Sequence, residues 1–379
     1  MKQITVGIAV DSFLPRWDGV SRALVELIPR LTENFRFKLM VPDYKGERPD
    51  FNGVEYALFP MIPGIRLEGA GIPIPSTASM RRAFEQVDLL WTHSVGSLGG
   101  KALRIAHEKS IPVLSMIHSI EWEIYAQNLP FGRRLFREFW LRECRRRYSV
   151  ATRILTPSQA TADALKAHGF SPPINVTPLG VDTERFSPLD KEARAKRKEE
   201  LGIPEGRFVF GYLGRFGAEK NLELLVDAFT SLNHPTAHLL LIGGDPNAIK
   251  RSTEHPAISA LGSTTTPEYF YQAMDAYVLP SRSESAPLAI LEAMSTGAIP
   301  LSTPVGNVPT YLRPEIGYLF EQGSKGELIA QMQTLLACSN AHDAMRSAAR
   351  KTVIEAFDWA KSAQALKIIF EETLGHSNR

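Results

Sequence analysis

Residues 281–297, SRSESAPLAILEAMSTG, directly follow the apolar run AYVL of residues 276–279 and Pro280. The apolar run predicts a buried strand, and the stretch from Leu288 to Met294 has the spacing of a helix after Pro287. The segment therefore predicts a strand, a loop and a helix. In a parallel α/β sheet such a loop lies at the carboxyl end of the strand, where backbone N–H groups and the helix dipole favour an anion.

Two glutamates in this segment are candidates for recognising hydroxyl groups. Glu284 lies in the predicted loop and Glu292 on the predicted helix. A carboxylate accepts hydrogen bonds from two neighbouring hydroxyls, as a sugar or a ribose presents them. The alternative is a structural role, in which the helix dipole favours Glu284 and Glu292 is simply an exposed helical residue.

A second strand, loop and helix precede this segment. Residues 208–213, FVFGYL, predict a strand, and the loop GRFGAEKN of residues 214–221 leads into a helix at residues 222–231. Arg215 and Lys220 bracket the loop. A planar guanidinium binds paired oxygens and an ammonium acts as a point charge, so this loop suits a diphosphate.

Together, GRFGAEKN and ESAPLAILEAMSTG resemble the signature of the retaining glycosyltransferases of family 4, which include sucrose synthases, phosphatidylinositol mannosyltransferases and bacterial glucosyl-diacylglycerol synthases. The resemblance implies an α/β fold of two facing Rossmann-like, doubly wound domains, the GT-B architecture. It places an acceptor-binding domain at residues 1–178 and a nucleotide-sugar-binding domain at residues 179–356. Residues 357–379 are expected to form a helix that crosses back to the first domain.

The resemblance also implies a reaction, the transfer of a hexose from a UDP- or GDP-hexose to an acceptor hydroxyl with retention of anomeric configuration. Arg215 and Lys220 would stabilise the departing diphosphate, Glu284 would hold sugar hydroxyls and Glu292 the ribose. Further donor contacts are expected from Gly19, Gly214, Gly262, Ser263, Ser285, Ala286 and Leu288. The sequence contains no Asp-x-Asp motif, and no metal or other cofactor is expected.

The chain departs from the family pattern at two points. The family commonly has Glu-Gly-Phe-Gly where this chain has ESAP at residues 284–287, and Pro287 offers no backbone N–H. In the first loop, Asp18 and Gly19 match the family, but a usual second glycine is missing. Gly19 either contacts a ligand or forms a plain turn with a positive φ. The identity of the donor therefore stays open.

The first half of the chain alternates between predicted strands and helices, which indicates a parallel doubly wound sheet. Strands are expected at residues 4–10, 37–41, 54–58, 89–92 and 113–117, and helices at 20–31, 78–86 and 99–108. Residues 61–76 are rich in Pro and Gly and predict a long loop. The hydroxyl of Ser158 is expected to cap the helix that begins at residue 159.

His93 and His118 each follow a predicted strand, so both are expected at the carboxyl edge of the sheet, where ligands bind. A structural role is the simpler interpretation for His93. Residues 118–125, HSIEWEIY, resemble the His-Ser/Thr…Tyr stretch of the lipid glycosyltransferases in the family. That resemblance implies that His118 contacts the transferred sugar and the acceptor, with Tyr125 on the acceptor side.

Residues 131–148 carry seven arginines and only two glutamates. At about 100° per residue, the apolar side chains of the first ten residues fall opposite Arg133, Arg134 and Arg137. This pattern predicts an amphipathic helix on anionic lipid. In the second half, apolar residues cluster on the formerly basic side, so that either the helix breaks near Trp140 or this half packs on the protein. A surface helix with solvated arginines is the alternative to membrane binding.

A length of 379 residues and a hydrophobic content of 44 % are consistent with two domains. The whole chain has 43 Lys and Arg and 41 Asp and Glu. Residues 1–180 contain 23 basic and 17 acidic residues, a net charge of +6. Residues 181–379 contain the remaining 20 basic and 24 acidic residues, a net charge of −4. The basic half predicts an anionic partner, and neither an RNA-binding nor a helix-turn-helix motif supports nucleic acid. Two cysteines form neither a disulfide framework nor a metal-ligand spacing.

The sequence therefore predicts a glycosyltransferase that acts on a membrane lipid. No apolar run is long enough to span a bilayer and no signal peptide is evident, so a cytoplasmic protein, peripheral on the inner face of the cell membrane, is expected. The alternatives are a soluble or polysaccharide acceptor, a nucleotide-sugar epimerase or hydrolase of the same fold, and a non-catalytic sensor. The oligomeric state is left open.

Overall fold

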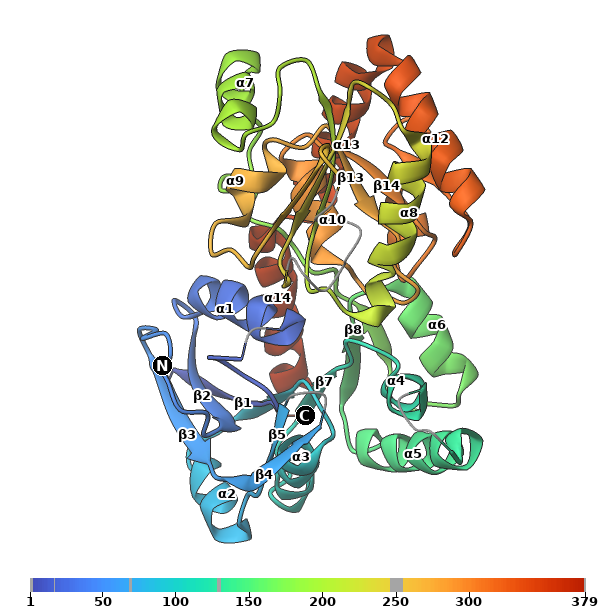
Figure 1. Ribbon diagram of the computed structural model, residues 1–379. Helices are drawn as coiled ribbons and strands as arrows, with labels where there is room; N and C mark the ends of the chain where they lie inside the picture. The colour runs from blue at the N-terminus through green and yellow to red at the C-terminus, as the bar shows by residue number, and fades with distance from the viewer. Residues whose placement is uncertain (1–2, 17, 68–69, 128–130, 246–254, 378–379) are drawn as a thin grey trace. The chain divides into compact units, whose positions relative to one another are not determined.

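The structure is a computed structural model, described here for residues 3–16, 18–67, 70–127, 131–245 and 255–377. The chain divides into two compact units (Figure 1). The first unit contains Met1–Leu179 and Trp359–Arg379, and the second contains Gly180–Asp358. These limits lie within two residues of the predicted domain boundaries, and the last helix is grouped with the first unit.

The first unit is built on a seven-stranded parallel sheet with the strand order β3-β2-β1-β6-β7-β8-β9. Its strands are β1 (Ile4–Ala9), β2 (Phe35–Pro42), β3 (Val54–Phe59), β6 (Leu89–Thr92), β7 (Val113–Met116), β8 (Arg153–Thr156) and β9 (Ile174–Val176). All residues of β6 and β7 are buried, as strands covered on both faces require. The strand order reverses between β1 and β6, which makes this edge the expected ligand site.

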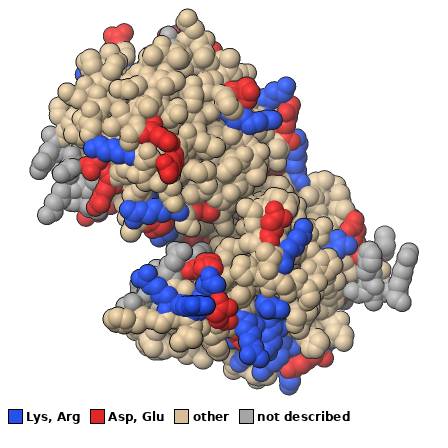
Figure 2. Space-filling view, turned by 90° about the vertical axis from the view of Figure 1, so that its right-hand side faces the viewer, with Lys and Arg blue, Asp and Glu red and all other residues tan. Residues whose placement is uncertain are grey.

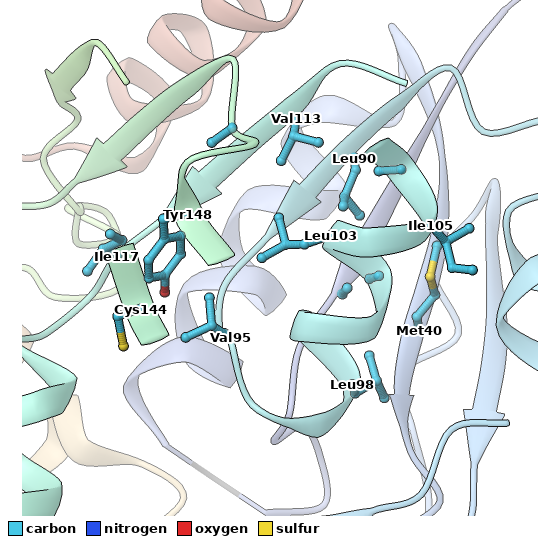
Figure 3. Packing of buried hydrophobic residues seen from close by; sticks show 14 of the residues in the cluster. Met40, Leu90, Val95, Leu98, Leu103, Ile105, Val113, Ile117, Cys144 and Tyr148 are labelled. Atoms are coloured by element: carbon cyan, nitrogen blue, oxygen red, sulfur yellow. The ribbon is translucent and has the colours of Figure 1, made fainter. Parts of the chain in front are cut away.

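Helices cover both faces of this sheet. They are α1 (Gly19–Leu31), α2 (Thr77–Ala83), α3 (Ser97–Glu108), α4 (Glu121–Gln127), α5 (Arg133–Tyr148), α6 (Gln159–Ala167) and α14 (Trp359–Ser377). On one face, α14 lies beside α1, and its Phe370 ring meets Phe35 and Trp91 edge-on with ring centres 5.3 Å apart in both cases. On the other, α3 buries apolar side chains against the sheet, and α5 packs beside α3 and α4 and adds side chains to the same cluster (Figure 3). Ser158 caps α6 as predicted, since its hydroxyl accepts from Thr161 N.

Residues 61–76 differ from the predicted loop. β4 (Met61–Leu67) and β5 (Ala70–Pro73) pair antiparallel in a ribbon separate from the main sheet. A Cβ on Gly71 would lie 2.5 Å from the Met61 sulfur, so a larger residue there would require the flexible Met61 side chain to move. Pro and Gly in the sequence concealed the ribbon, because both residues are usually depleted in strands.

The second unit repeats the architecture with a six-stranded parallel sheet of order β12-β11-β10-β13-β14-β15. Its strands are β10 (Phe208–Leu213), β11 (Ala237–Ile242), β12 (Ile258–Leu261), β13 (Ala276–Leu279), β14 (Ile299–Ser302) and β15 (Tyr318–Leu319). Its α-helices are α7 (Lys191–Glu200), α8 (Leu222–Leu232), α9 (Pro267–Tyr271), α10 (Leu288–Ser295), α11 (Val308–Tyr311), α12 (Lys325–Ala337) and α13 (His342–Ala356). Here the order reverses between β10 and β13, the two strands that carry the signature loops.

Candidate active site

The two signature loops meet at the switch point of the second sheet. β10 and β13 are direct neighbours, with Phe210 opposite Ala276 and Gly211 opposite Tyr277. The loops that follow them therefore emerge side by side at the carboxyl edge, where open α/β sheets bind ligands. The strand–loop–helix pattern expected around residues 281–297 is present.

Lys220 and Glu284 form an ion pair between these loops. Lys220 Nζ lies 2.6 Å from Glu284 Oε1, and the Ser281 hydroxyl donates to the same oxygen at 2.9 Å. The two charged side chains are only 17 % and 14 % exposed, so solvent screens their attraction weakly. The cation predicted to bind phosphate and the carboxylate predicted to bind hydroxyl groups therefore lie in direct contact.

Arg282 ties the two loops together, a role that the sequence did not reveal. Its backbone N–H donates to Glu219 O at 2.7 Å, and its Nη2 donates to Asn221 Oδ1 at 2.9 Å. From the loop after β14, Asn307 N donates to Ser285 O at 3.0 Å. The position of Arg282 inside the motif was a possible signal, but a sequence does not show which way a loop side chain points.

Arg215 does not join the Lys220–Glu284 pair, and its role at the diphosphate stays a prediction. Its side chain is 77 % exposed and pairs with Glu219 at 3.3 Å. Such a surface pair is worth only about 0.3–0.5 kcal/mol, so it restrains the guanidinium weakly. The exposed guanidinium is therefore accessible to a ligand and only weakly held by Glu219.

The glycines at the ends of β10, β11 and β12 allow three backbones to converge. Gly243 N donates to Leu261 O at 3.2 Å and to Gly262 O at 3.1 Å. Gly243 has φ +119°, and a Cβ there would lie 2.5 Å from Gly214 O. Gly262 and Ser263 are exposed at this edge, and their predicted contact with the donor stays a prediction.

Glu292 is buried within α10, with 2 % of its surface exposed. The alternative interpretation as an exposed helical glutamate is therefore wrong, while its role at the ribose stays a prediction. Leu288, the first residue of α10, is 8 % exposed, and Ser285 and Ala286 lie half-buried just before the helix begins. Backbone groups at these two residues remain candidates for donor contacts.

At the switch point of the first sheet, two histidines contact each other. His93 Nδ1 lies 2.8 Å from His118 Nε2. Burial lowers the pKa of His93 well below its ordinary value, and the neighbouring His118 lowers it further. Burial also lowers the pKa of His118 to about 4, although the charge of Asp18 acts in the opposite direction. Both rings are therefore neutral at pH 7.

The first loop is held by two carboxylates that cap helices. Asp11 accepts from Leu98 N at 2.7 Å and from Gly99 N at 3.2 Å at the start of α3. Asp18 accepts from Ser21 N at 2.8 Å at the start of α1. Gly19 is the first residue of α1, and its φ is not positive, so the plain-turn interpretation is wrong. A Cβ on Gly19 would meet nothing within 4 Å, and its ligand contact stays a prediction.

Helix α5 is continuous, and its second half packs on the protein, which decides between the two predicted possibilities. Leu141, Cys144 and Tyr148 are buried. The opposite face is apolar and exposed at its start, where Phe131, Leu135 and Phe139 are 88 %, 80 % and 64 % exposed. Figure 2 shows basic side chains clustered low on the side of the molecule that carries α5.

The three arginines predicted to bind lipid are not equivalent. Arg133 and Arg134 are exposed, whereas Arg137 lies 3.2 Å from Glu123 and 2.7 Å from Glu138. The hydrogen bond with Glu138, aided by the charge of Glu123, raises the pKa of Arg137. Arg137 is therefore already paired within the protein. The side chain of Tyr125 lies outside the described residues.

The remaining expectations concern membrane spans and metal ions. In the described parts of the chain, no helix is long and apolar enough to cross a membrane. Among the same residues, no group of three or more His, Cys, Asp or Glu could hold a metal ion. A reaction without a metal stays a prediction.

Comparison with known protein families identifies the family of this chain. The family described as Glycosyltransferase Family 4 matches residues 17–185, and the family described as Glycosyl transferases group 1 matches residues 193–352. The chain belongs to glycosyltransferase family 4. As a member of this family, the glycosyltransferase uses a nucleotide sugar as its donor.

Curated relatives resemble this glycosyltransferase at modest identity. It is 28 % identical over 291 residues to the sulfoquinovosyl transferase SQD2 of Arabidopsis thaliana, a match that covers 74 % of this chain and 56 % of that protein. It is 25 % identical over 382 residues to a GDP-mannose-dependent alpha-mannosyltransferase of Mycolicibacterium smegmatis, covering 98 % of this chain and 96 % of that protein.

Solved structures show the fold. Anabaena HepE in complex with UDP-glucose has a TM-score of 0.77 at 17 % identity, covering 97 % of this chain and 100 % of that chain. WaaG, a glycosyltransferase involved in lipopolysaccharide biosynthesis, has a TM-score of 0.74 at 16 % identity, covering 97 % and 99 %. The predicted fold, two Rossmann-like α/β domains of the GT-B class, is confirmed.

Proposed function

We propose that this glycosyltransferase moves a hexose from a UDP- or GDP-hexose to the hydroxyl of a membrane lipid, with retention of configuration. The observation that carries the transfer is the Lys220–Glu284 pair at the switch point of the nucleotide-binding sheet. Relatives named for UDP-glucose binding and for GDP-mannose dependence support both donor classes. A relative named for sulfoquinovosyl transfer supports an acidic hexose as a further donor to test.

The charges of the pair suit the bond that breaks. Cleavage of the glycosidic C–O bond leaves positive charge on the sugar and builds negative charge on the departing phosphate. Lys220 stabilises that phosphate, and Glu284 turns to the sugar hydroxyls when the donor separates the pair. Double displacement would need a carboxylate nucleophile beneath the sugar. The proposed reaction instead occurs on one face, and the leaving phosphate oxygen takes the acceptor's proton.

The proposal of a lipid acceptor is based on the exposed face of α5. Phe131, Leu135 and Phe139 form an apolar ridge on this face. One helical repeat beyond Leu135, the same face continues through the exposed Arg142, while Arg146 on this face is paired with Glu143. Such a helix inserts its apolar end and leaves its arginines among anionic headgroups, each cation contributing about 1 kcal/mol. The proposed location is therefore the cytoplasmic face of a membrane.

The reaction is tested with UDP-, GDP- and ADP-hexoses, UDP-sulfoquinovose and a panel of diacylglycerol, phosphatidylinositol and soluble sugar acceptors. Mass spectrometry identifies the product, and NMR gives its anomeric configuration. An α-linked glycolipid from an α-linked donor is expected. A product with inverted anomeric configuration would contradict the proposed retention. Products formed only on soluble acceptors would contradict the proposed lipid acceptor. Release of free sugar or an epimer without acceptor points to the hydrolase or epimerase alternative.

Membrane attachment is tested separately by sedimentation with vesicles of phosphatidylglycerol and phosphatidylcholine. The variant Leu135→Ser/Phe139→Ser is expected to lose binding at every salt concentration. The variant Arg134→Gln/Arg142→Gln should lose it mainly at low salt, where charge contributes most. Ile354→Ser, at a 42 % exposed apolar residue on α13, is the matched control. Equal binding by all four proteins would contradict a role for α5.

A further inference from the structure

His93 and His118 meet edge to edge at the carboxyl ends of β6 and β7. Their nitrogens are 2.8 Å apart, while the ring centres are 5.1 Å apart and the planes differ by only 20°. Rings with such close nitrogens and distant centres cannot be stacked face to face. The N–H of one ring therefore points along the line to the other nitrogen, which is the geometry of a strong hydrogen bond.

The protons of this pair can be arranged in two ways. Both rings are neutral at pH 7, and a neutral imidazole carries one N–H donor and one acceptor nitrogen. In the first arrangement, His93 Nδ1–H donates to His118 Nε2, and His118 keeps its own proton on Nδ1. In the second, His118 Nε2–H donates to His93 Nδ1, and the proton of His93 lies on its Nε2.

The burial of His93 distinguishes the two arrangements. His93 is 4 % exposed, and its Nε2 is buried with no hydrogen-bond partner among the described residues. The second arrangement would bury an N–H group without an acceptor there, whereas the first leaves only a lone pair. Buried orphan donors are rarer than under-satisfied acceptors. The first arrangement is therefore favoured.

We propose that His93 is a positioning residue that fixes His118 in the Nδ1–H tautomer. Because His118 Nε2 is occupied by His93, Nδ1 is the nitrogen left for a ligand, and it is a hydrogen-bond donor. His118 can then hold a hydroxyl or phosphate oxygen but cannot accept the acceptor's proton. This catalytic consequence rests on the proposed function and agrees with a reaction in which the leaving phosphate takes that proton.

The tautomer is tested in the full-length protein labelled with ¹⁵N-histidine, by long-range ¹H–¹⁵N correlation at pH 7. Among the nine histidines, the signals of His118 and His93 are identified by their loss in His118→Gln and His93→Phe. In the native protein, His118 is expected to have a protonated Nδ1 and an unprotonated Nε2. In His93→Phe, the tautomer equilibrium of His118 is expected to shift toward the Nε2–H form. A native His118 with protonated Nε2 would overturn the proposal. This measurement needs no activity, so it stands or fails independently of the proposed function.

Kinetics separate positioning from packing. His93→Phe keeps an aromatic ring but removes both ring nitrogens, and is expected to lower kcat about tenfold or more with little change in donor KM. His93→Asn, whose amide can donate from near the Nδ1 position, should recover most of that loss. His238→Asn is the control, because His238 is also buried and its Nε2 lies 2.9 Å from the Ser259 hydroxyl in the other unit. A loss in His93→Asn equal to that in His93→Phe would reduce His93 to a structural residue.

Discussion

Lys220 Nζ lies 2.6 Å from Glu284 Oε1, across two loops that are 64 residues apart in the sequence. The contact joins the loops that follow neighbouring strands, so it holds the two signature loops together. For a half-buried ion pair of this kind, the free energy of unfolding falls more when one partner is removed than when both are replaced. The reason is that the remaining charge is left without an opposite charge beside it.

The first prediction concerns the stability of this pair. Lys220→Met and Glu284→Gln are each expected to lower the free energy of unfolding by about 1–3 kcal/mol, and the double variant by less than the sum. Urea denaturation followed by far-UV circular dichroism measures the coupling. The exposed Arg215–Glu219 pair is the matched control, with coupling below about 0.5 kcal/mol. Additive losses at Lys220 and Glu284 would contradict the contact.

The second prediction concerns turnover. Lys220→Ala is expected to lower kcat about 10²-fold or more while the donor's dissociation constant rises less, because its charge is needed most in the transition state. Arg215→Ala should follow the same pattern if the exposed guanidinium contacts the diphosphate. Single-turnover rates and donor titrations measure the two quantities. A loss at Arg215 that falls on binding alone would make it a docking residue.

The third prediction concerns Glu121 and the pH dependence of stability. Glu121 Oε1 accepts from the buried Tyr148 hydroxyl at 3.2 Å, and burial raises the pKa of Glu121 from 4.5 to about 7. The folded protein then binds a proton that the unfolded chain releases, so the free energy of unfolding falls as the pH rises from 4.5 to about 7. Glu121→Gln removes the free-energy cost of ionising this buried carboxyl group. Because Glu121 is partly accessible, a gain of about 1–2 kcal/mol at pH 8 is expected, and none at pH 4.5.

Tryptophan fluorescence measures this effect, because all five tryptophans lie in the first unit. Glu143→Gln on α5 is the control of opposite sign. The hydrogen bond with Arg146 outweighs burial and lowers the pKa of Glu143 to about 2, so the charged form stabilises the fold above pH 4.5 and its contribution is lost as the pH falls through 2. Glu143→Gln should therefore be less stable than the native protein at pH 7. A Glu121→Gln curve parallel to the native one would contradict the raised pKa.

Much of the fold followed from the sequence, because buried parallel strands appear as apolar runs whose order and spacing are visible. Residues 208–213 and 276–279 marked two such strands, and the rule that ligands bind at their carboxyl ends brought Lys220 and Glu284 to one edge. What the sequence could not supply were contacts between side chains. Its pattern shows that His93 and His118 share an edge, but not that their rings touch.

Helix α5 shows a second limit of the sequence. Its amphipathic pattern was visible, yet a pattern does not say which face meets the protein. The structure buries Leu141, Cys144 and Tyr148 and leaves Leu135 and Phe139 exposed. Packing of the second half fixes the rotation of the whole helix, and that packing depends on a core assembled from distant strands.

The last prediction concerns Asp275, which precedes β13 at the edge opposite the signature loops. Asp275 is 7 % exposed, and its carboxylate lies within 3.0 Å of three cations, Arg194, Lys198 and Arg346. It also accepts from Val209 N at 2.8 Å. Burial raises its pKa, but the charges of Arg194 and Lys198 outweigh burial and hold it below the ordinary value. Removing this carboxylate leaves three half-buried cations facing one another.

Asp275→Ala is therefore expected to lower the free energy of unfolding by about 3–5 kcal/mol. The second unit contains no tryptophan, so the loss should appear in far-UV circular dichroism, while tryptophan fluorescence reports the first unit. Asp343→Ala is the control, because Asp343 is 79 % exposed and lies 3.8 Å from Arg346. Adding Lys198→Met to Asp275→Ala should restore part of the loss, since it removes one repelling cation. Equal stabilities of Asp275→Ala and Asp343→Ala would show that the three cations find other partners.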